Sequence, residues 1–417
     1  MGTESKKQNK LGVKMKNPTK YRGNELKYVE SVLNSENWSA TAGSWNQVLE
    51  NKLAEKFGVK YAVAFNSGTS TLHAALEACG VQEGDEVISP ALTVIMNTTA
   101  TIHANAIPVY ADVNPDTFTI DPEDIRRKIT PKTKAIFVVS LYGLPCDMDP
   151  IMEIAKEHGI FVIEDNAQCF MSRYKGRLTG TIGHVASYSF ENTKHISCGE
   201  GGAIITNDEY IAMMSRKVGG HGFKNLQASE GRVRLRQDIF QNPNYKRHDV
   251  LGWNYRLSEF NAAIALAQLE KSDELVDMRI KSAELFTEVM KNCDFLIPQK
   301  TPAGYENSYY TLGVKYEGLS FIGVTWQDFR KKYIELGGDG IYGSWAIPYF
   351  EPVVKNLQFA YRNPKIYSDL KFEKGLCPNA ELIQPKIMQF KTNYRDLDLA
   401  ELKASILEKT INYYKGV

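Results

Sequence analysis

The feature that most constrains the fold is the alternation of short apolar segments with helical segments between residues 61 and 206. Segments typical of strands lie at 61–65, 86–90, 107–113, 135–140, 159–168 and 203–206. Helical patterns lie between several of them, at 71–79, 93–103, 122–128 and 149–158. Strands that are joined by helices run parallel and are covered on both faces. The sequence therefore predicts an α/β fold with a mostly parallel sheet.

One lysine lies in a turn between two apolar segments. Lys194 follows Ser189 by five positions, and Gly199-Glu200-Gly201-Gly202 then leads into the apolar run at 203–206. A lysine held in a fixed pocket can lose its charge near neutral pH and act as a Schiff-base nucleophile. A lone lysine before a glycine turn is more often a solvated surface residue, so the catalytic interpretation depends on other residues.

The segment 159–168 supplies those residues, because it is apolar and ends in Glu164-Asp165-Asn166-Ala167-Gln168. Side chains at the carboxyl end of a parallel strand point into the ligand crevice of an open α/β sheet. An aspartate there can keep the pyridine nitrogen of pyridoxal 5'-phosphate (PLP) protonated, while a lysine carries the cofactor's aldehyde. The order of these residues predicts PLP as the cofactor, with Lys194 and Asp165 as catalytic residues.

The turn Asn66-Ser67-Gly68-Thr69-Ser70 joins the strand at 61–65 to the next helix. Small hydroxyl and glycine residues at a helix N-terminus expose backbone N–H groups beside a positive dipole end, which suits a phosphate group. The same residues also suit a plain helix N-cap. The turn alone leaves both interpretations open.

Charge and cysteine usage exclude several classes of protein. The formal net charge of the 417 residues is +1, so no overall field attracts nucleic acid or a membrane. The six cysteines have neither CxxC pairs nor zinc-type spacing, and we expect no metal site and no disulfide framework. Residues 1–20 are rich in lysine and lack an apolar core, which predicts a basic flexible leader on a cytoplasmic protein rather than a signal peptide.

The chain is long enough for two domains. We expect a large cofactor-binding domain over 21–277 and a smaller α+β domain over 278–417. An amphipathic helix is predicted from Ser258 to Leu275 near the end of the first domain. The stretch 224–249 is rich in Arg, Gln and Asn, and it fits either a solvated loop or a cationic flap over an anionic substrate.

Five motifs together resemble the DegT/DnrJ/StrS class of PLP-dependent enzymes, which aminate keto sugars attached to nucleotides. The resemblance extends from about Tyr21 to Tyr394. The motifs are Asn66-Ser67-Gly68-Thr69, Glu164-Asp165-Asn166-Ala167-Gln168, Ser189-Phe190 with Lys194, Gly199-Glu200-Gly201-Gly202, and Gly252-Trp253-Asn254-Tyr255-Arg256. The resemblance implies the aspartate aminotransferase-like fold type I, with a mostly parallel seven-stranded sheet in the large domain. It also implies a homodimer whose active sites are shared between subunits.

The resemblance further implies roles for single residues. Lys194 would bind the cofactor aldehyde and move protons, and Asp165 would pair with the pyridine nitrogen. Gln168 would contact the ring hydroxyl. The remaining cofactor-binding residues would be Ser67, Gly68, Thr69, Val94 and Ser189, with Asn254 and Arg256 reaching the phosphate from the other subunit. The expected substrate contacts are His195, His221, Tyr309, Tyr310 and Trp345.

The chain departs from the family pattern at two positions. Val94 stands where the family usually places an aromatic residue that stacks on the cofactor ring. His195 directly follows Lys194, and a sister group with histidine at the lysine position dehydrates 4-keto sugars at C3. Counting from Ser189 puts lysine at the reactive position, which favours amination with glutamate or glutamine as the donor. Three alternatives stay open: the 3-dehydratase, an aminocyclitol or keto-acid-sugar aminotransferase, and a non-catalytic regulator.

Overall fold

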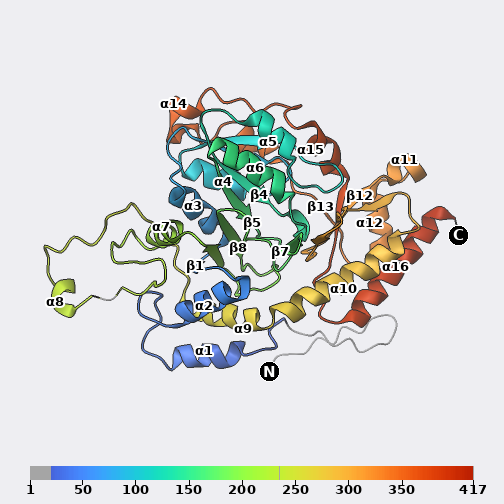
Figure 1. Ribbon diagram of the computed structural model, residues 1–417. Helices are drawn as coiled ribbons and strands as arrows, with labels where there is room; N and C mark the ends of the chain where they lie inside the picture. Colours follow the sequence, from blue (N-terminus) through green and yellow to red (C-terminus); the bar gives the residue numbers. More distant parts are fainter. Residues whose placement is uncertain (1–19, 234, 417) are drawn as a thin grey trace.

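A seven-stranded sheet lies at the centre of the computed structural model, which describes residues 20–233 and 235–416 (Figure 1). The strand order is β1-β9-β8-β5-β4-β2-β3, and only β9 runs antiparallel to its neighbours. The strands are β1 (Tyr61–Phe65), β2 (Glu86–Pro90), β3 (Ile107–Ala111), β4 (Thr133–Val139), β5 (Phe161–Asp165), β8 (Val185–Ser189) and β9 (Gly202–Thr206). The predicted α/β fold with a mostly parallel sheet is confirmed.

Helices cover both faces of this sheet, as the apolar runs predicted. Phe137 of β4 belongs to one buried cluster, together with side chains of α3 and α7, whereas its neighbours Ile136 and Val138 belong to another with α6. Successive residues of a strand point to opposite faces, so a strand buried on both sides is apolar throughout. The covering helices are α3 (Gly68–Ala78), α4 (Met96–His103), α5 (Pro122–Lys128), α6 (Met148–His158) and α7 (Glu209–Gly219).

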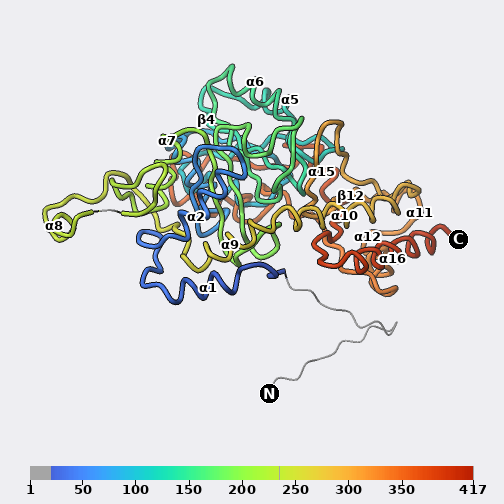
Figure 2. Tube along the Cα trace, turned by 60° about the horizontal axis from the view of Figure 1, so that its bottom comes forward, coloured from blue at the N-terminus to red at the C-terminus, as the bar shows by residue number. Residues whose placement is uncertain are grey.

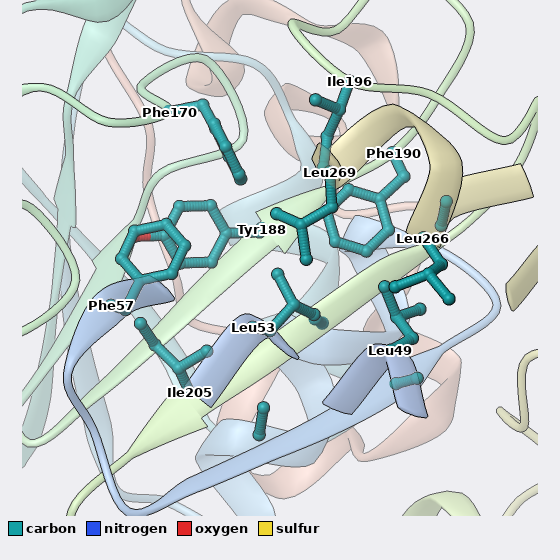
Figure 3. Close-up of a cluster of buried hydrophobic side chains, with 14 of the residues drawn as sticks. Leu49, Leu53, Phe57, Phe170, Tyr188, Phe190, Ile196, Ile205, Leu266 and Leu269 are labelled. Carbon is teal, nitrogen blue, oxygen red and sulfur yellow. The ribbon is translucent and has the colours of Figure 1, made fainter. Parts of the chain in front are cut away.

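A third buried cluster joins the sheet to two helices at residues 45–57 and 259–270. Figure 3 shows Leu49 and Leu53 of α2 (Trp45–Phe57) and Leu266 of α9 (Glu259–Glu270) packed over Tyr188 and Ile205 of the sheet. Leu49 and Leu53 are fully buried, and burying a leucine side chain contributes about 1.5–3 kcal/mol relative to an exposed one. The amino-terminal helix α1 (Glu25–Leu33) packs outside on α9.

The single helix predicted over residues 258–275 is wrong, because the chain forms two helices there. α9 ends at Glu270, Lys271 has non-helical backbone angles, and α10 runs from Ser272 to Met290. α10 leaves the sheet, since Val276 packs in the cluster under the sheet while Phe286 packs in a separate carboxyl-terminal cluster. The sequence Glu-Lys-Ser contains no glycine or proline at this point, so the change of direction left no local signal.

The carboxyl-terminal part is built around a small antiparallel sheet of order β10-β12-β14-β13. Its strands are β10 (Leu296–Pro298), β12 (Leu312–Tyr316), β13 (Tyr342–Gly343) and β14 (Ile387–Phe390). The helices α10, α12 (Trp326–Glu335) and α16 (Leu397–Lys415) pack with it. The boundary drawn at 277/278 falls inside α10.

Part of the carboxyl-terminal sequence returns to the large sheet. Side chains between Ile347 and Ile387 share one buried cluster with Tyr110 and Leu141, which lie at the large sheet. This segment contains the short helices α13 (Pro352–Lys355), α14 (Pro364–Tyr367) and α15 (Pro378–Ile383). Residues after 278 therefore contribute to two cores, and α15 lies near α5 in Figure 1.

The remaining elements lie at the periphery. β6 (Arg173–Tyr174), β7 (Arg177–Leu178) and β11 (Tyr305–Glu306) form a small three-stranded sheet, and α11 (Gly318–Ile322) precedes α12. Both Figure 1 and Figure 2 show the segment around α8 (Gln237–Phe240) projecting from the body. Within the described ranges, every helix is too short or too polar to cross a bilayer. The predicted leader lies outside the described residues, except for Lys20.

Candidate active site

The predicted site residues gather at one edge of the large sheet. β1, β2, β4, β5 and β8 run in the same direction, so their carboxyl ends meet at this edge, where β9 begins. Ser67, Val94, Asp165 and Ser189 all follow or end such strands. This edge is where open α/β sheets bind ligands.

Asp165 is the buried carboxylate of the site, with 2% of its surface exposed. Its Oδ1 accepts a hydrogen bond of 3.1 Å from the Ala167 N–H, and its Oδ2 accepts one of 2.9 Å from Asn97 Nδ2. Burial raises the pKa of the Asp165 carboxyl, whereas these hydrogen bonds and the charge of Lys194 oppose the rise. In the described part of the chain no cationic group lies within 4 Å of it, so the carboxylate suits a protonated ring nitrogen.

Asn97 holds Asp165 in place and was not predicted from the sequence. Its Oδ1 accepts a 3.2 Å hydrogen bond from the Thr93 hydroxyl, which fixes the amide with its Nδ2 toward the carboxylate. Because Thr93 is used in this way, α4 begins at Met96 rather than at Thr93 as predicted. Asn97 is fully buried in the first turn of α4, and no local motif in the sequence singles it out.

The turn before α3 forms a cradle with the ends of β8 and β9. α3 begins at Gly68, three residues before the predicted start, and a Cβ at Gly68 would lie 2.8 Å from Ser189 Cβ. A Cβ at Gly202 would lie 2.8 Å from the Ser67 carbonyl. These distances leave no room for side chains, so the backbone of the turn lies directly against Ser189 and β9.

The hydrogen bonds of this cradle divide its residues into two roles. The Ser67 hydroxyl caps α3, since it accepts from the Ser70 N–H at 3.1 Å and donates to Ser70 Oγ at 3.0 Å. The N–H groups of Gly68 and Thr69 belong to the first helical turn and have no intrahelical partner. Ser189 Oγ accepts a 3.3 Å bond from the Glu191 N–H and keeps its own proton available. The cradle therefore suits a phosphate held by backbone N–H groups and one hydroxyl.

Lys194 lies half-buried in the turn after β8. Its Nζ lies 4.6 Å from the centroid of the Tyr310 ring, and no carboxylate in the described ranges pairs with it. The Tyr310 hydroxyl is 2.8 Å from Thr193 Oγ1, so the ring is tied to the same turn. The structure thus brings together Lys194 and Tyr310, two residues for which the sequence predicts separate roles.

Gln168 is held through its oxygen. Oε1 accepts a 3.0 Å hydrogen bond from the Tyr142 N–H, which leaves the amide NH2 group as a donor toward a ligand. Tyr142 has a left-handed backbone (φ +63°), a conformation that non-glycine residues adopt at a cost of about 1–3 kcal/mol and often at functional sites. No sequence motif singles out Tyr142.

Tyr142 also connects this edge to Trp345. Its ring stacks on that of Trp345 with a centroid distance of 6.2 Å, and its hydroxyl donates to Ser344 Oγ at 3.2 Å. Trp345 and Tyr310 line an open cavity of about 560 Å³ together with Thr193, Tyr342 and Lys391. Both residues therefore face open space, and the Tyr310 ring lies beside Lys194.

The other predicted substrate contacts are not among the residues that line this cavity. The Tyr309 ring packs against the carboxyl-terminal cluster instead of the cavity. His195 is 1% exposed and its Nε2 lies 3.0 Å from the Ser308 carbonyl oxygen, while burial and Arg279 hold its pKa well below the usual value. His221 lies beside Trp253, whose carbonyl accepts from the His221 N–H at 2.9 Å.

Asn254 and Arg256 run along the edge of β1 in their own chain. The Asn254 carbonyl accepts a 3.3 Å hydrogen bond from Asn66 Nδ2, and Arg256 forms an isolated bridge with Phe65. This places both residues next to the cradle turn. Their predicted contact with the phosphate of a second subunit stays a prediction, as do the roles of Val94, which is half-buried after β2, and of the other site residues.

No three His, Cys, Asp or Glu side chains of the described residues converge as metal ligands would. The arrangement is instead that of an organic cofactor site: a buried carboxylate, an amide donor, a phosphate cradle and a lysine at one sheet edge. Each feature matches one part of PLP, namely the ring nitrogen, the ring hydroxyl, the phosphate and the aldehyde.

Comparisons with known proteins agree with this chemistry. Residues 20–321 match the DegT/DnrJ/EryC1/StrS aminotransferase family. The chain is 40% identical over 275 residues to a GDP-perosamine synthase of Escherichia coli O157:H7. The aligned region covers 66% of this chain and 70% of that protein. The chain is also 36% identical over 330 residues to an L-glutamine:2-deoxy-scyllo-inosose aminotransferase of Micromonospora echinospora, covering 77% and 76%.

A solved structure shows the same architecture. DesV of S. venezuelae, determined in complex with a ketimine intermediate, superposes with a TM-score of 0.79 at 26% identity over 93% of this chain and 94% of that one. The fold is thus that of the fold type I aminotransferases, and PLP is the cofactor. The chain is a PLP-dependent aminotransferase and belongs to the DegT/DnrJ/EryC1/StrS aminotransferase family.

Proposed function

We propose that this enzyme moves an amino group from glutamate or glutamine to a keto sugar. The acceptor that we favour is a keto sugar linked to a nucleotide. The observation that carries the proposal is the convergence of Lys194, Asp165 and the cradle at one edge, beside a cavity lined by Tyr310 and Trp345. The relative named GDP-perosamine synthase supports a nucleotide-linked acceptor. Products of this kind are used in cell-surface polysaccharides, including lipopolysaccharide, and in other amino-sugar biosynthesis.

When bound, PLP supplies an aldehyde that can bond either to the Lys194 amine or to a substrate amine. Its ring accepts electrons from the substrate carbon next to that amine. The α3 N-terminus and Ser189 would hold the phosphate, and the Gln168 amide would donate to the ring oxygen. The Asp165 carboxylate would keep a proton on the ring nitrogen, because a buried anion strongly favours a cation beside it. Asn97 keeps that carboxylate from turning away.

Lys194 would also carry the proton between donor and acceptor carbons. Its amine, once displaced, stays within reach of the reacting carbon, so it can take a proton there and return it. The face of the Tyr310 ring attracts its ammonium form at 4.6 Å and so holds the side chain near the site between steps. Proton transfer by a positioned group contributes about 10²–10⁴-fold to the rate.

A cyclitol ketone is the second candidate acceptor. The relative that aminates 2-deoxy-scyllo-inosose covers more of this chain than the GDP-perosamine synthase does, and its name specifies glutamine as the donor. A cyclitol has no nucleotide, so the two candidates differ in what occupies the cavity around Trp345. A keto-acid-sugar acceptor has no comparable support.

The dehydratase and regulator alternatives fit less well. A dehydratase base at His195 would have to face the substrate, yet the ring is buried with Nε2 at the Ser308 carbonyl. A regulatory protein without catalytic activity would not need a lysine, a buried carboxylate and a phosphate cradle at the same edge of the sheet.

We further propose a homodimer. The Asn254 side chain is exposed at the cradle turn, which is the position from which it would reach the phosphate of a second copy. The cytoplasmic location, and the absence of nucleic-acid and membrane partners, stay predictions from the sequence.

Direct product analysis tests the acceptor and the donor together. Purified enzyme with PLP is incubated with ¹⁵N-glutamate or ¹⁵N-glutamine and with either a GDP-linked 4-keto-6-deoxyhexose or 2-deoxy-scyllo-inosose. We expect one ¹⁵N per product molecule and one oxo acid per turnover. Loss of a hydroxyl without gain of nitrogen would identify a dehydratase, and lack of turnover with bound PLP would contradict both acceptors.

A further inference from the structure

Arg279 of α10 is a buried cation without a carboxylate partner. Its surface is 1% exposed, and it ranks among the largest fully buried side chains of the described residues. No Asp or Glu of residues 20–233 and 235–416 lies within 4 Å of it, and its Nε has no hydrogen-bond partner there. Burying a charge without a counter-charge is costly, so the position calls for an explanation.

Among the described residues, the acceptors of the guanidinium are all backbone carbonyl groups of the proposed reactive site. Nη2 donates to the carbonyl of Thr193 at 2.7 Å and to that of Lys194 at 3.2 Å, and Nη1 donates to the carbonyl of Tyr310. The guanidinium also lies 5.6 Å from the centroid of the Tyr310 ring, the ring that faces Lys194 Nζ. One side chain thus fixes both the turn of the lysine and the tyrosine opposite it.

A second cation binds the same turn from a distant part of the sequence. Lys20 Nζ donates to the carbonyl of Asn192 and, at 3.3 Å, to that of Lys194. The Lys194 carbonyl therefore accepts from both Lys20 and Arg279. Burial, with Arg279 and Arg395 nearby, lowers the pKa of Lys20 to about 7, and burial with Arg395 lowers that of Arg279 to about 9. These shifts reflect the cost of placing two cations here.

Arg279 also lies where α10 passes between two cores. Val276 packs in the cluster under the large sheet, and Phe286 packs in the carboxyl-terminal cluster. The Arg279 side chain reaches the turn that carries Lys194 from this part of α10. It therefore fixes the position of that turn relative to both parts of the molecule. Hydrogen bonds to charged donors contribute about twice as much as neutral ones, which makes this a strong restraint.

We propose that Arg279, assisted by Lys20, is a positioning residue that sets the place of Lys194 relative to the cofactor and to Tyr310. The inference rests on the proposed role of Lys194. Since a displacement of about 1 Å can reduce a rate about 10²-fold, loss of this restraint should act on turnover more than on binding.

The test compares Arg279→Met, Arg279→Lys and Lys20→Met with wild type in the PLP-loaded enzyme. We expect Arg279→Met to lower kcat about 10²-fold with KM for the amino donor changed less than about threefold, and Lys20→Met to lower kcat about threefold. Arg279→Lys keeps one charged donor and should recover part of the loss. The visible circular dichroism of bound PLP, measured without substrate, should change in the same order.

Lys281→Met is the matched control, because Lys281 is an exposed cation on the same helix, paired with Asp277 at 2.7 Å. It should behave as wild type. A kcat for Arg279→Met within twofold of wild type, or unchanged dichroism in all three variants, overturns the inference. If Arg279→Met does not fold, Lys20→Met and Arg279→Lys decide it by the same two measurements. The dichroism needs no sugar, so failure of the proposed acceptor is recognised separately by wild type that binds PLP without turnover.

Discussion

Two polar regions of this enzyme are prominent in its sequence: the residues at the sheet edge and the stretch 224–249. In the structure they differ in burial and in the partners of their polar groups. At the sheet edge, two buried polar side chains are held by partners from other segments: Asn97 holds Asp165, and the Tyr142 N–H holds Gln168. In the projecting stretch 224–249, charges are paired with near neighbours at the surface: Arg232 with Glu230 and Arg236 with Asp238. Tertiary contacts thus position these groups at the sheet edge, whereas these charges of the stretch 224–249 pair locally at the surface.

The projecting stretch also contacts the body, since the Ser229 carbonyl accepts from Gln47 Nε2 at 2.9 Å and the Val233 N–H donates to the Thr41 carbonyl at 3.2 Å. Asp249 pairs with Lys217 of α7 at 2.7 Å, and the Arg247 guanidinium lies over the Phe240 ring at 4.9 Å. Within the stretch, the ion pairs of Arg232 with Glu230 and of Arg236 with Asp238 compensate part of the positive charge that a flap over an anionic substrate would need. The solvated-loop interpretation of 224–249 is therefore favoured for the single chain.

The sharpest contrast between the two regions comes from changing a lysine in each. Lys194→Ala should lower kcat about 10⁴-fold, because both the nucleophile and the proton carrier are lost. Lys246→Ala, at an exposed position of the projecting stretch, should leave kcat within twofold. Steady-state kinetics and the visible absorbance of bound PLP check both. Normal turnover by Lys194→Ala would remove the basis of the proposed mechanism.

A smaller effect is expected at the cradle. Gly68→Ala places a Cβ 2.8 Å from Ser189 Cβ, so the turn must shift and its N–H groups move off the phosphate. We expect PLP to bind about tenfold more weakly, measured by fluorescence titration of the apoenzyme. Gly23→Ala is the control, since its Cβ would meet nothing closer than 3.4 Å. Equal PLP affinity in both variants would show that the cradle does not hold the phosphate.

The buried His195 predicts a pH effect on stability. Its pKa in the folded state is well below the ordinary 6.5, so the unfolded chain binds more protons below pH 6.5. Stability should therefore be lost as the pH falls from 6.5 toward the folded pKa, by at most about 1.4 kcal/mol per pH unit. His195→Gln should reduce this slope in thermal unfolding between pH 6.5 and 5.5, whereas the exposed His158→Gln should not.

The same variant tests the dehydratase alternative. If His195 is structural, His195→Gln keeps most of its turnover at pH 7.5. A loss of turnover comparable to that of Lys194→Ala would instead assign His195 a catalytic role. His195 could then no longer be distinguished from Lys194 as a purely structural residue.

The smallest effect should come from charge neutralisation in the projecting stretch. Arg236→Gln with Lys246→Gln removes two exposed charges, and exposed pairs contribute only about 0–1 kcal/mol. We expect the KM for a nucleotide sugar to change less than twofold. A tenfold higher KM in the double variant, matched by the wild-type KM at high salt, would show that residues 224–249 act as a cationic flap.

The sequence was sufficient where topology determines position. Parallel strands bring their carboxyl ends together, so Asp165 could be assigned to this edge from the end of its apolar segment, whereas the roles of Gln168 and Ser189 came from the family resemblance. It was insufficient where position depends on contacts between distant segments. Asn97, Tyr142 and Arg279 carry no local motif, and their roles follow only from partners 26 to 86 residues away.

The break at Lys271 illustrates the same limit. The turn between α9 and α10 follows from the positions of two cores, since the residues around it favour helix. Tyr309 illustrates it on a smaller scale, because adjacent tyrosines look alike in sequence and only the packed structure sends one ring to the cavity and the other to the core.

The glycine-lined cradle has a consequence for redesigning this enzyme. A surface made of backbone N–H groups and one serine hydroxyl suits the shape and charge of a phosphate, and Ser189 is its one side chain that would contact the phosphate. Discrimination between acceptors must then be encoded across the cavity, around Tyr342 and Trp345. Libraries confined to residues 340–348 should therefore shift acceptor range while leaving cofactor retention intact.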